Sequence, residues 1–175
     1  MTERTIAPPR PAVRELSAQE EAQRVAAGAS AAILVCTLAI GAVTFLGTSD
    51  HLPLRVRLDN VAGGGLLMLL LMVPACLFGL WPADAATRRL SRPARLVIFA
   101  AGGALAGAIA GAAFAAFWGT PLEGALAGAT IGILGGLAGL AGLTWVSRSR
   151  GWVIVLSVLA ILLVAYGTIQ LQSFE

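Results

Sequence analysis

Small residues recur at every fourth position through two neighbouring apolar segments, and this spacing constrains the fold more than any other feature of the chain. Seven glycines form the pattern: Gly103, Gly107, Gly111, Gly124, Gly128, Gly132 and Gly136. Ala115 and Gly119 continue the first run. Residues four apart lie on one face of a helix. Each segment is therefore predicted to be a helix with a smooth stripe, the small-xxx-small pattern of helices that pack closely in membranes.

Composition places the chain in a bilayer. Hydrophobic residues make up 58% of its 175 residues and charged residues only 12%, about half the charged fraction of an average soluble domain. A chain this apolar would aggregate in water, so we expect an all-α integral membrane protein. Its length leaves room for one membrane domain and no sizeable soluble domain.

Five apolar segments are each long enough to cross the hydrocarbon core, which takes about 20 helical residues. We place them at about 26–46, 61–81, 96–118, 123–146 and 152–171. They form a single transmembrane domain over residues 17–175, and the proline-containing residues 1–16 are predicted to be a disordered cytoplasmic arm. Ser17 and Glu20 have the spacing of a capping box that starts the first helix.

The arginines predict the orientation. Ten of them flank the apolar segments on the side of the N-terminus, whereas only Arg55 and Arg57 lie on the other side. Cytoplasmic loops carry the excess of basic residues, so we expect the N-terminus in the cytoplasm and the C-terminus outside the inner (plasma) membrane. All four tryptophans, Trp81, Trp118, Trp145 and Trp152, fall at segment ends, as in an interfacial aromatic belt. The exclusive use of Arg as the basic residue suggests a GC-rich bacterial genome.

The two glycine-striped segments are predicted to form a tight hairpin. At the turn, Thr120 stands at the cap position, Pro121 at the first helical position and Glu123 at the third. Glu123 is the only ionisable residue between Leu96 and Val146. Capping at the outer interface accounts for this acid, and a proton or cation role is the alternative.

The second segment of the hairpin carries more glycine than one contact needs. Gly135, Gly139 and Gly142 lie beside the 124–136 run. We therefore expect internal packing of the hairpin and a further contact with another copy of the chain or with another membrane subunit.

Three other regions attract attention. Pro74 is predicted to kink the second segment. The stretch from Thr48 to Asn60 is either an ordinary connecting loop or, since its apolar residues alternate, an extended segment on the membrane surface, where Arg55 and Arg57 contact lipid headgroups or a partner. The second loop, Pro82 to Arg95, is expected to be a short cytoplasmic helix or turn. Four arginines gather there near Asp84, and we expect them at anionic headgroups, or alternatively against a cytoplasmic partner: Arg88, Arg89, Arg92 and Arg95.

We expect no catalytic, cofactor-binding or metal-binding residue. His51 is the only histidine, and with Asp50 and Asp59 nearby it still lacks the ligands that a metal site requires. Cys36 and Cys76 fall inside apolar segments at different predicted depths, so we expect free thiols. The arginines form no continuous basic face, which argues against nucleic acid.

An enzyme is disfavoured because the usual general bases are nearly absent. Two classes of function remain. The first is a structural or accessory subunit that packs through its glycine-rich helices. The second is a small oligomeric transporter, channel or lipid-handling protein, which would need a polar stripe through the bilayer. The candidates for a stripe are hydroxyls that their own helices can satisfy: Thr37, Thr44, Thr130, Thr144 and Ser157.

Overall fold

The computed structural model describes residues 17–47, 52–117 and 119–172, without the side chains at 59, 60, 62–72, 77, 167 and 170–172. Over these residues the chain is 91% helical and has no strand. Five long helices follow one another, with one short 3₁₀ helix before the last: α1 (Ala18–Gly47), α2 (Leu54–Thr87), α3 (Arg92–Ala116), α4 (Pro121–Thr144), η1 (Val146–Arg148) and α5 (Arg150–Gln172). The predicted disordered arm at 1–16 lies outside the described residues.

Each of the five predicted apolar segments lies on one of these helices. Within the described part of the chain, three helical segments are long and apolar enough to cross a membrane: α1, α3, and the stretch Pro121–Arg148 that α4 forms with η1. Arg150–Tyr166 of α5 is a shorter apolar helix. The chain is thus an all-helical protein with membrane-compatible helices.

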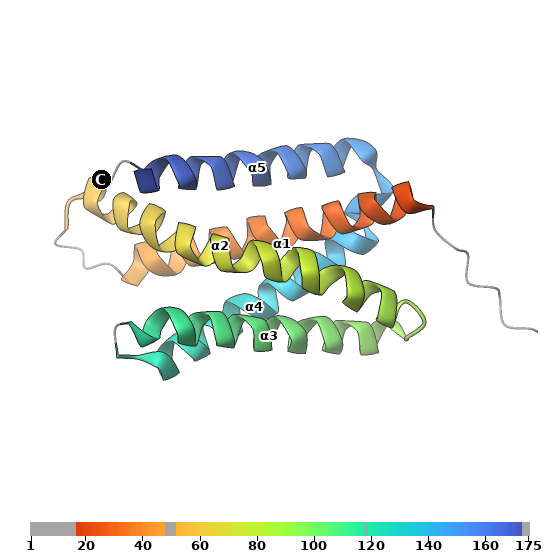
Figure 1. Ribbon diagram of the computed structural model, residues 1–175, viewed down its shortest axis with the longest axis horizontal. Helices are drawn as coiled ribbons and strands as arrows, with labels where there is room; N and C mark the ends of the chain where they lie inside the picture. Colours follow the sequence, from red (N-terminus) through yellow and green to blue (C-terminus); the bar gives the residue numbers. More distant parts are fainter. Residues whose placement is uncertain (1–16, 48–51, 118, 173–175) are drawn as a thin grey trace, which may run out of the picture.

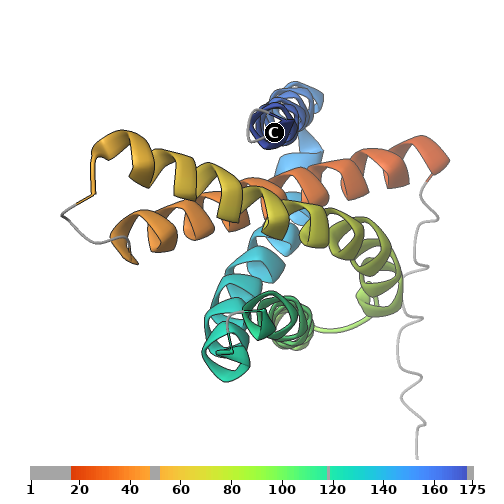
Figure 2. The same ribbon diagram turned by 60° about the vertical axis from the view of Figure 1, so that its left-hand side comes forward.

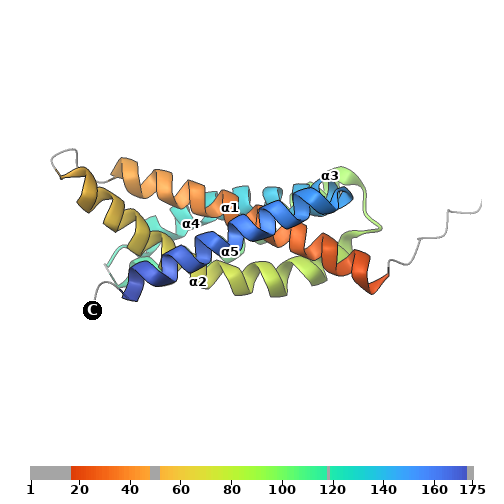
Figure 3. The same cartoon turned by 90° about the horizontal axis from the view of Figure 1, so that it is seen from above.

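The helices run side by side in three levels (Figure 1). The α1–α2 pair occupies the middle, with α5 on one side and the α3–α4 pair on the other (Figures 1 and 2). From above, α5 lies across the α1–α2 pair (Figure 3), and it contacts both of those helices. α4 packs against α3 on one side and α1 on the other, so it joins two of the levels.

The closest contact in the bundle is between the backbones of α3 and α4. A Cβ atom added to Gly107 would collide with the carbonyl oxygen of Gly128, and one added to Gly128 would collide with the carbonyl oxygen of Gly107. Gly103 with Gly132, and Gly111 with Gly124, repeat this reciprocal contact. Gly136 continues it against the backbone of Phe99. Only glycine allows helices to approach this closely.

A second set of α4 glycines faces the rest of the same chain. A Cβ at Gly142 would collide with the carbonyl oxygen of Ala27, and one at Gly135 with Sγ of Cys36. At Gly139, it would come within 2.9 Å of Leu80 Cδ2. These are the glycines that the sequence led us to assign to a partner or a second copy. α1 and α2 cover them, so they give no support for an additional subunit.

Of two predicted helix caps, the one at α1 forms its side-chain hydrogen bonds and the one at α4 does not. The capping box at α1 is confirmed, because Ser17 Oγ accepts from the Glu20 amide at 3.2 Å and Glu20 Oε2 accepts from the Ser17 amide at 2.9 Å. Pro121 and Glu123 occupy the first turn of α4 as predicted, but Thr120 makes no side-chain cap bond. Its ψ of 51° differs from the extended backbone that normally aims a capping hydroxyl at the helix.

Gly119 does not belong to the packing stripe. Its φ of +76° is left-handed, and a Cβ at this position would meet nothing within 4 Å. The Gly119 amide donates to the carbonyl of Ala116 at 3.2 Å, and the Thr120 amide donates to that of Ala115 at 3.1 Å. Glycine is needed here because it ends α3 in the left-handed conformation.

The extended stretch predicted before residue 60 is wrong. α2 begins at Leu54, with Pro53 as its cap residue, and therefore takes in Val56, Arg57 and Leu58. Proline fixes a φ that suits the start of a helix. The apolar side chains of Leu54, Val56 and Leu58 are all exposed, so no buried face selects a periodicity at this end of α2. Arg57 Nη2 donates to the carbonyl of Phe45 at 2.8 Å, and its guanidinium lies 4.2 Å from the centre of the Phe45 ring.

α2 also extends further at its other end. Pro74 and Pro82 both lie inside it, and the helix continues through them to Thr87. The first six residues of the segment that we expected as a short cytoplasmic helix or turn are therefore helical, as a continuation of α2. A kink at Pro74 stays a prediction.

Hydroxyl groups inside the helices bond mainly to their own backbone, as predicted. Each of four threonines donates to a carbonyl four residues earlier: Thr37, Thr44, Thr130 and Thr144. Ser157 differs, because its Oγ lies 3.1 Å from Ser30 Oγ and so links α5 to α1.

The backbone contact between α3 and α4 gives the first testable prediction. We expect Gly128→Ala to lower the free energy of unfolding by about 1–3 kcal/mol, because the added methyl group overpacks the contact. Gly102→Ala is the matched control on α3, since a Cβ there meets nothing within 4 Å. It should be neutral or stabilising by up to about 1 kcal/mol, as alanine favours a helix. Thermal denaturation in detergent, followed by circular dichroism, measures both, and equal effects would contradict the prediction.

Candidate functional site: an apolar groove below an arginine cluster

A buried carboxylate gathers three arginines at one end of the bundle. Asp84 in the last turn of α2 is 0% exposed. It accepts hydrogen bonds from Arg24 Nη2 of α1 at 3.2 Å, Arg88 Nε at 2.9 Å and Arg95 Nη2 of α3 at 2.8 Å. Arg88 Nη2 also contacts Glu21 Oε1 of α1 at 2.6 Å. We call these five residues the arginine cluster.

Local sequence explains part of this cluster. Asp84 and Arg88 are four residues apart, so a helix brings them to one face. Burial of Arg88 lowers its pKa. The hydrogen bonds to Glu21 and Asp84 and their negative charges raise the pKa by more than burial lowers it, so the net shift is upward. A cation whose pKa is raised by folding stabilises the folded protein until the pH rises through that pKa. The Arg88 contacts therefore persist through the neutral range.

The cluster retains positive charge and unused hydrogen-bond donors. Three guanidinium groups face two carboxylates. The buried Nε atoms of Arg24 and Arg95 have no hydrogen-bond partner among the described residues. Buried donors without partners are uncommon and costly. Among the described residues, the cluster carries more positive than negative charge.

The four arginines of the second loop divide into two pairs. Arg88 and Arg95 turn inward to Asp84, whereas Arg89 and Arg92 are exposed. Of the four second-loop arginines that we assigned to lipid headgroups or a partner, two are thus already engaged within the chain. Arg55 is exposed at the opposite end, where Arg57 contacts Phe45.

An apolar cavity lies next to the cluster. Its volume is about 180 Å³, and residues of α1, α2, α3 and α4 line it. Buried side chains and backbone form its floor, among them Cys36, Leu80, Phe99, Gly132 and Gly135. We call this cavity the α2–α3 groove, because its rim comes from those two helices.

The rim residues show where the groove opens. On α2 they include Ala75 and Gly79, and on α3 they include Ile98, Gly102 and Ala106. All five are exposed, and they recur at four-residue spacing along each helix. The groove therefore opens outward from the bundle between α2 and α3, along the apolar part of both helices.

Both cysteines line this groove, and both are free thiols. The free thiols are as expected, and the different depths of the two cysteines in a bilayer stay a prediction. Gly135 leaves the space that Sγ of Cys36 occupies.

Size and lining limit what the groove can hold. Pockets for drug-sized molecules enclose about 300–1,000 Å³, whereas an apolar cavity of about 150 Å³ holds a benzene ring. Among the described lining residues, only Cys36 and Cys76 have polar side-chain groups, their thiols. The groove therefore suits a slender apolar chain better than a polar metabolite.

Other predicted positions lie elsewhere or outside the described residues. Glu123 is exposed in the first turn of α4, at the end away from the cluster. His51, Asp50 and the side chain of Asp59 lie outside the description. Over the part of the chain that is described, no three metal-ligating side chains gather.

Sequence reasoning noted Asp84 beside four arginines but did not find the cluster. The Asp84–Arg88 spacing was the available signal. The contribution of Arg24 could not be read from the sequence, because it depends on how α1 packs against α2.

No protein-family model, curated protein or solved structure matches this chain. The groove and the arginine cluster are therefore interpreted from their own geometry and chemistry.

The cluster makes Asp84 important for stability. We expect Asp84→Asn to destabilise the protein by about 3–5 kcal/mol, because it leaves buried guanidinium groups without their counter-ion. Glu123→Gln is the control, since this exposed acid contributes about 0.3–1 kcal/mol through the helix dipole. Chemical denaturation in mixed micelles measures both variants. A loss no larger for Asp84→Asn than for Glu123→Gln would show that the cluster does not hold the helices together.

Proposed function

We propose that this chain is a five-span integral membrane protein that holds a second membrane component in the α2–α3 groove, without catalysing a reaction. The groove is the observation that carries the proposal. It opens outward between two apolar helices, and its described lining residues offer no acid or base other than two thiols. Such a lining supports binding of an apolar chain rather than proton transfer.

The outer surface of the bundle supports a location within the bilayer. Large apolar side chains are exposed on helices at different sides of the bundle, such as Leu38 at 70%, Ile109 at 64% and Ile161 at 65%. Soluble monomers rarely expose apolar surface so extensively. Three helices meet the length and hydropathy of a membrane span, and we propose α2 and α5 as the other two.

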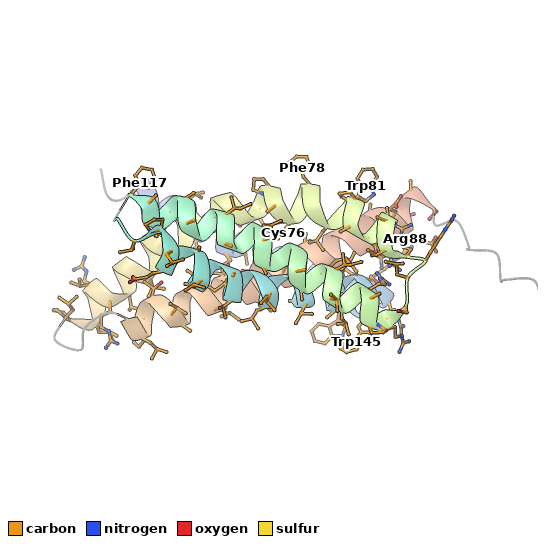
Figure 4. The ribbon with its side chains drawn as sticks, turned by 90° about the horizontal axis from the view of Figure 1, so that it is seen from below. Cys76, Phe78, Trp81, Arg88, Phe117 and Trp145 are labelled. Atoms are coloured by element: carbon orange, nitrogen blue, oxygen red, sulfur yellow. The ribbon has the colours of Figure 1, made fainter. Side chains whose placement is uncertain are left out.

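The ends of the helices support the proposed orientation. The N-terminal ends of α1, α3 and α5 and the C-terminal ends of α2 and α4 share the arginine-rich end. Trp81 and Trp145 lie on opposite edges of the bundle toward the end that carries Arg88, and Phe117 lies toward the other end (Figure 4). The positive-inside rule places the arginine-rich end in the cytoplasm. The C-terminus is then outside.

The length of α2 fits this placement. Its 34 residues span roughly 51 Å at 1.5 Å per residue, more than a hydrocarbon core of about 30 Å. Both ends of α2 can therefore reach the headgroups. These ends carry Arg55 and Arg57 on one side and Asp84 on the other.

A lipid is the first candidate for the bound component, and a helix of another membrane subunit is the second. The second candidate rests on the small residues of the rim, Ala75 and Gly79 on α2 and Gly102 and Ala106 on α3, which another helix could approach. In that case the chain is a structural or accessory subunit of a larger assembly.

Reporter fusions test the orientation. A reporter that is active only in the cytoplasm should be active when inserted between Arg89 and Leu90, and silent when fused after Glu175. A reporter that is active only outside should give the reverse pattern. Cytoplasmic activity at both sites would contradict five spans.

Native mass spectrometry after mild detergent extraction tests the groove. We expect the full chain to retain an added mass, which Gly102→Leu should remove by filling the mouth of the groove. Ala101→Leu is the matched control, because Ala101 is exposed beside Gly102 but does not line the groove. An added mass that matches a lipid species indicates a lipid, and one that matches a polypeptide indicates a protein subunit. Equal retention by all three proteins would overturn the groove as the binding site.

A further inference from the structure

We propose that the α2–α3 groove binds one anionic phospholipid of the cytoplasmic leaflet, with an acyl chain in the groove and the phosphate at the arginine cluster. This inference rests on the proposed function, because it assumes that the groove holds a membrane component. It adds the charge of that component, the leaflet it comes from and the residues that recognise its headgroup.

The groove and the cluster are continuous. Leu80 and Phe99 at the floor of the groove lie four residues from Asp84 and Arg95, respectively. Four residues correspond to about one helical turn, roughly 6 Å along the axis. A molecule that leaves the groove at this end therefore meets the cluster directly.

The cluster end has the charge to hold a phosphate. Its three guanidinium groups outnumber its two carboxylates among the residues described. Arg92, Arg95 and Phe99 follow one face of α3, and Arg92 is exposed. The first turn of α3 contains no acidic residue, so its helix dipole adds to the attraction for an anion.

The length of the groove matches one leaflet. The α3 rim from Ile98 to Ala106 extends about 12 Å along the helix axis, close to half of the ~30 Å hydrocarbon core. Trp81, 53% exposed, lies toward the end of the bundle that carries Arg88 (Figure 4) and places this end at the depth of the headgroups. The bound chain is therefore an acyl chain of the cytoplasmic leaflet.

The same dimensions favour a lipid over a partner helix. A helix with side chains is about 10–12 Å wide and would contact both leaflets. Beyond the rim, α3 exposes the bulky side chain of Ile109 at 64%. The small-residue surface thus ends about where one acyl chain would end, and charge at a single end matches an amphiphile.

The experiment uses the full chain, purified and delipidated, then titrated in neutral detergent with phosphatidylglycerol or phosphatidylcholine. Native mass spectrometry counts the bound lipid. We expect one phosphatidylglycerol per chain and weaker binding of phosphatidylcholine. Gly102→Leu should abolish the bound lipid and Ala101→Leu should retain it. Arg92→Gln should weaken phosphatidylglycerol binding about fivefold, the effect of about one arginine near an anionic surface.

Arg148→Gln is the control for Arg92→Gln, because it removes another exposed arginine from η1 at the same end of the bundle. Unchanged binding in Arg148→Gln together with the loss in Arg92→Gln supports the headgroup site. Equal binding of the two lipids, or equal effects of the two arginine variants, would overturn the anionic specificity while leaving the groove intact. Binding that Gly102→Leu leaves unchanged would overturn the groove as the lipid site. Capture of a second protein by the groove instead of a lipid would also overturn this inference, but would support the accessory-subunit function.

Discussion

The ion cluster around Asp84 determines how the helices meet at one end of the bundle. A carboxylate with no exposed surface is costly unless charged donors surround it, and Arg24, Arg88 and Arg95 supply these donors. They come from α1, from the end of α2 and from α3, so the carboxylate ties three helices together. Because α2 and α3 are joined here, they can separate further along, and the groove opens in that space.

α4 supplies the second constraint. One row of its glycines lies against the α3 backbone, and another lies against α1 and Leu80 of α2. Because two faces of α4 carry glycine, α4 can lie in the interior close to its neighbours. In lipid, such close packing replaces the hydrophobic effect as the source of stability. The groove is the place where this close packing stops.

The groove and the cluster together are complementary to an anionic amphiphile. The cavity is apolar, and the adjoining end of the bundle carries more positive than negative charge among the described residues. This arrangement changes the balance between the two functions that the sequence left open. The glycines that favoured a partner subunit are used within the chain, whereas the groove favours a lipid.

The sequence by itself determined the helices, because apolar segments of membrane length must pair their backbone groups internally. It also determined the capping box at Ser17 and the local bonding of the threonine hydroxyls. It failed before residue 60, where alternating residues suggested an extended stretch, although the start of a helix tolerates the proline at 53. It also did not show that α2 continues through Pro82 without a break. Only the tertiary structure decided that Arg24 reaches Asp84, that Cys36 and Cys76 share one groove, and that the extra glycines of α4 face α1. These contacts depend on how helices distant in sequence cross, and a pattern along one helix carries no information about which neighbour covers each of its faces.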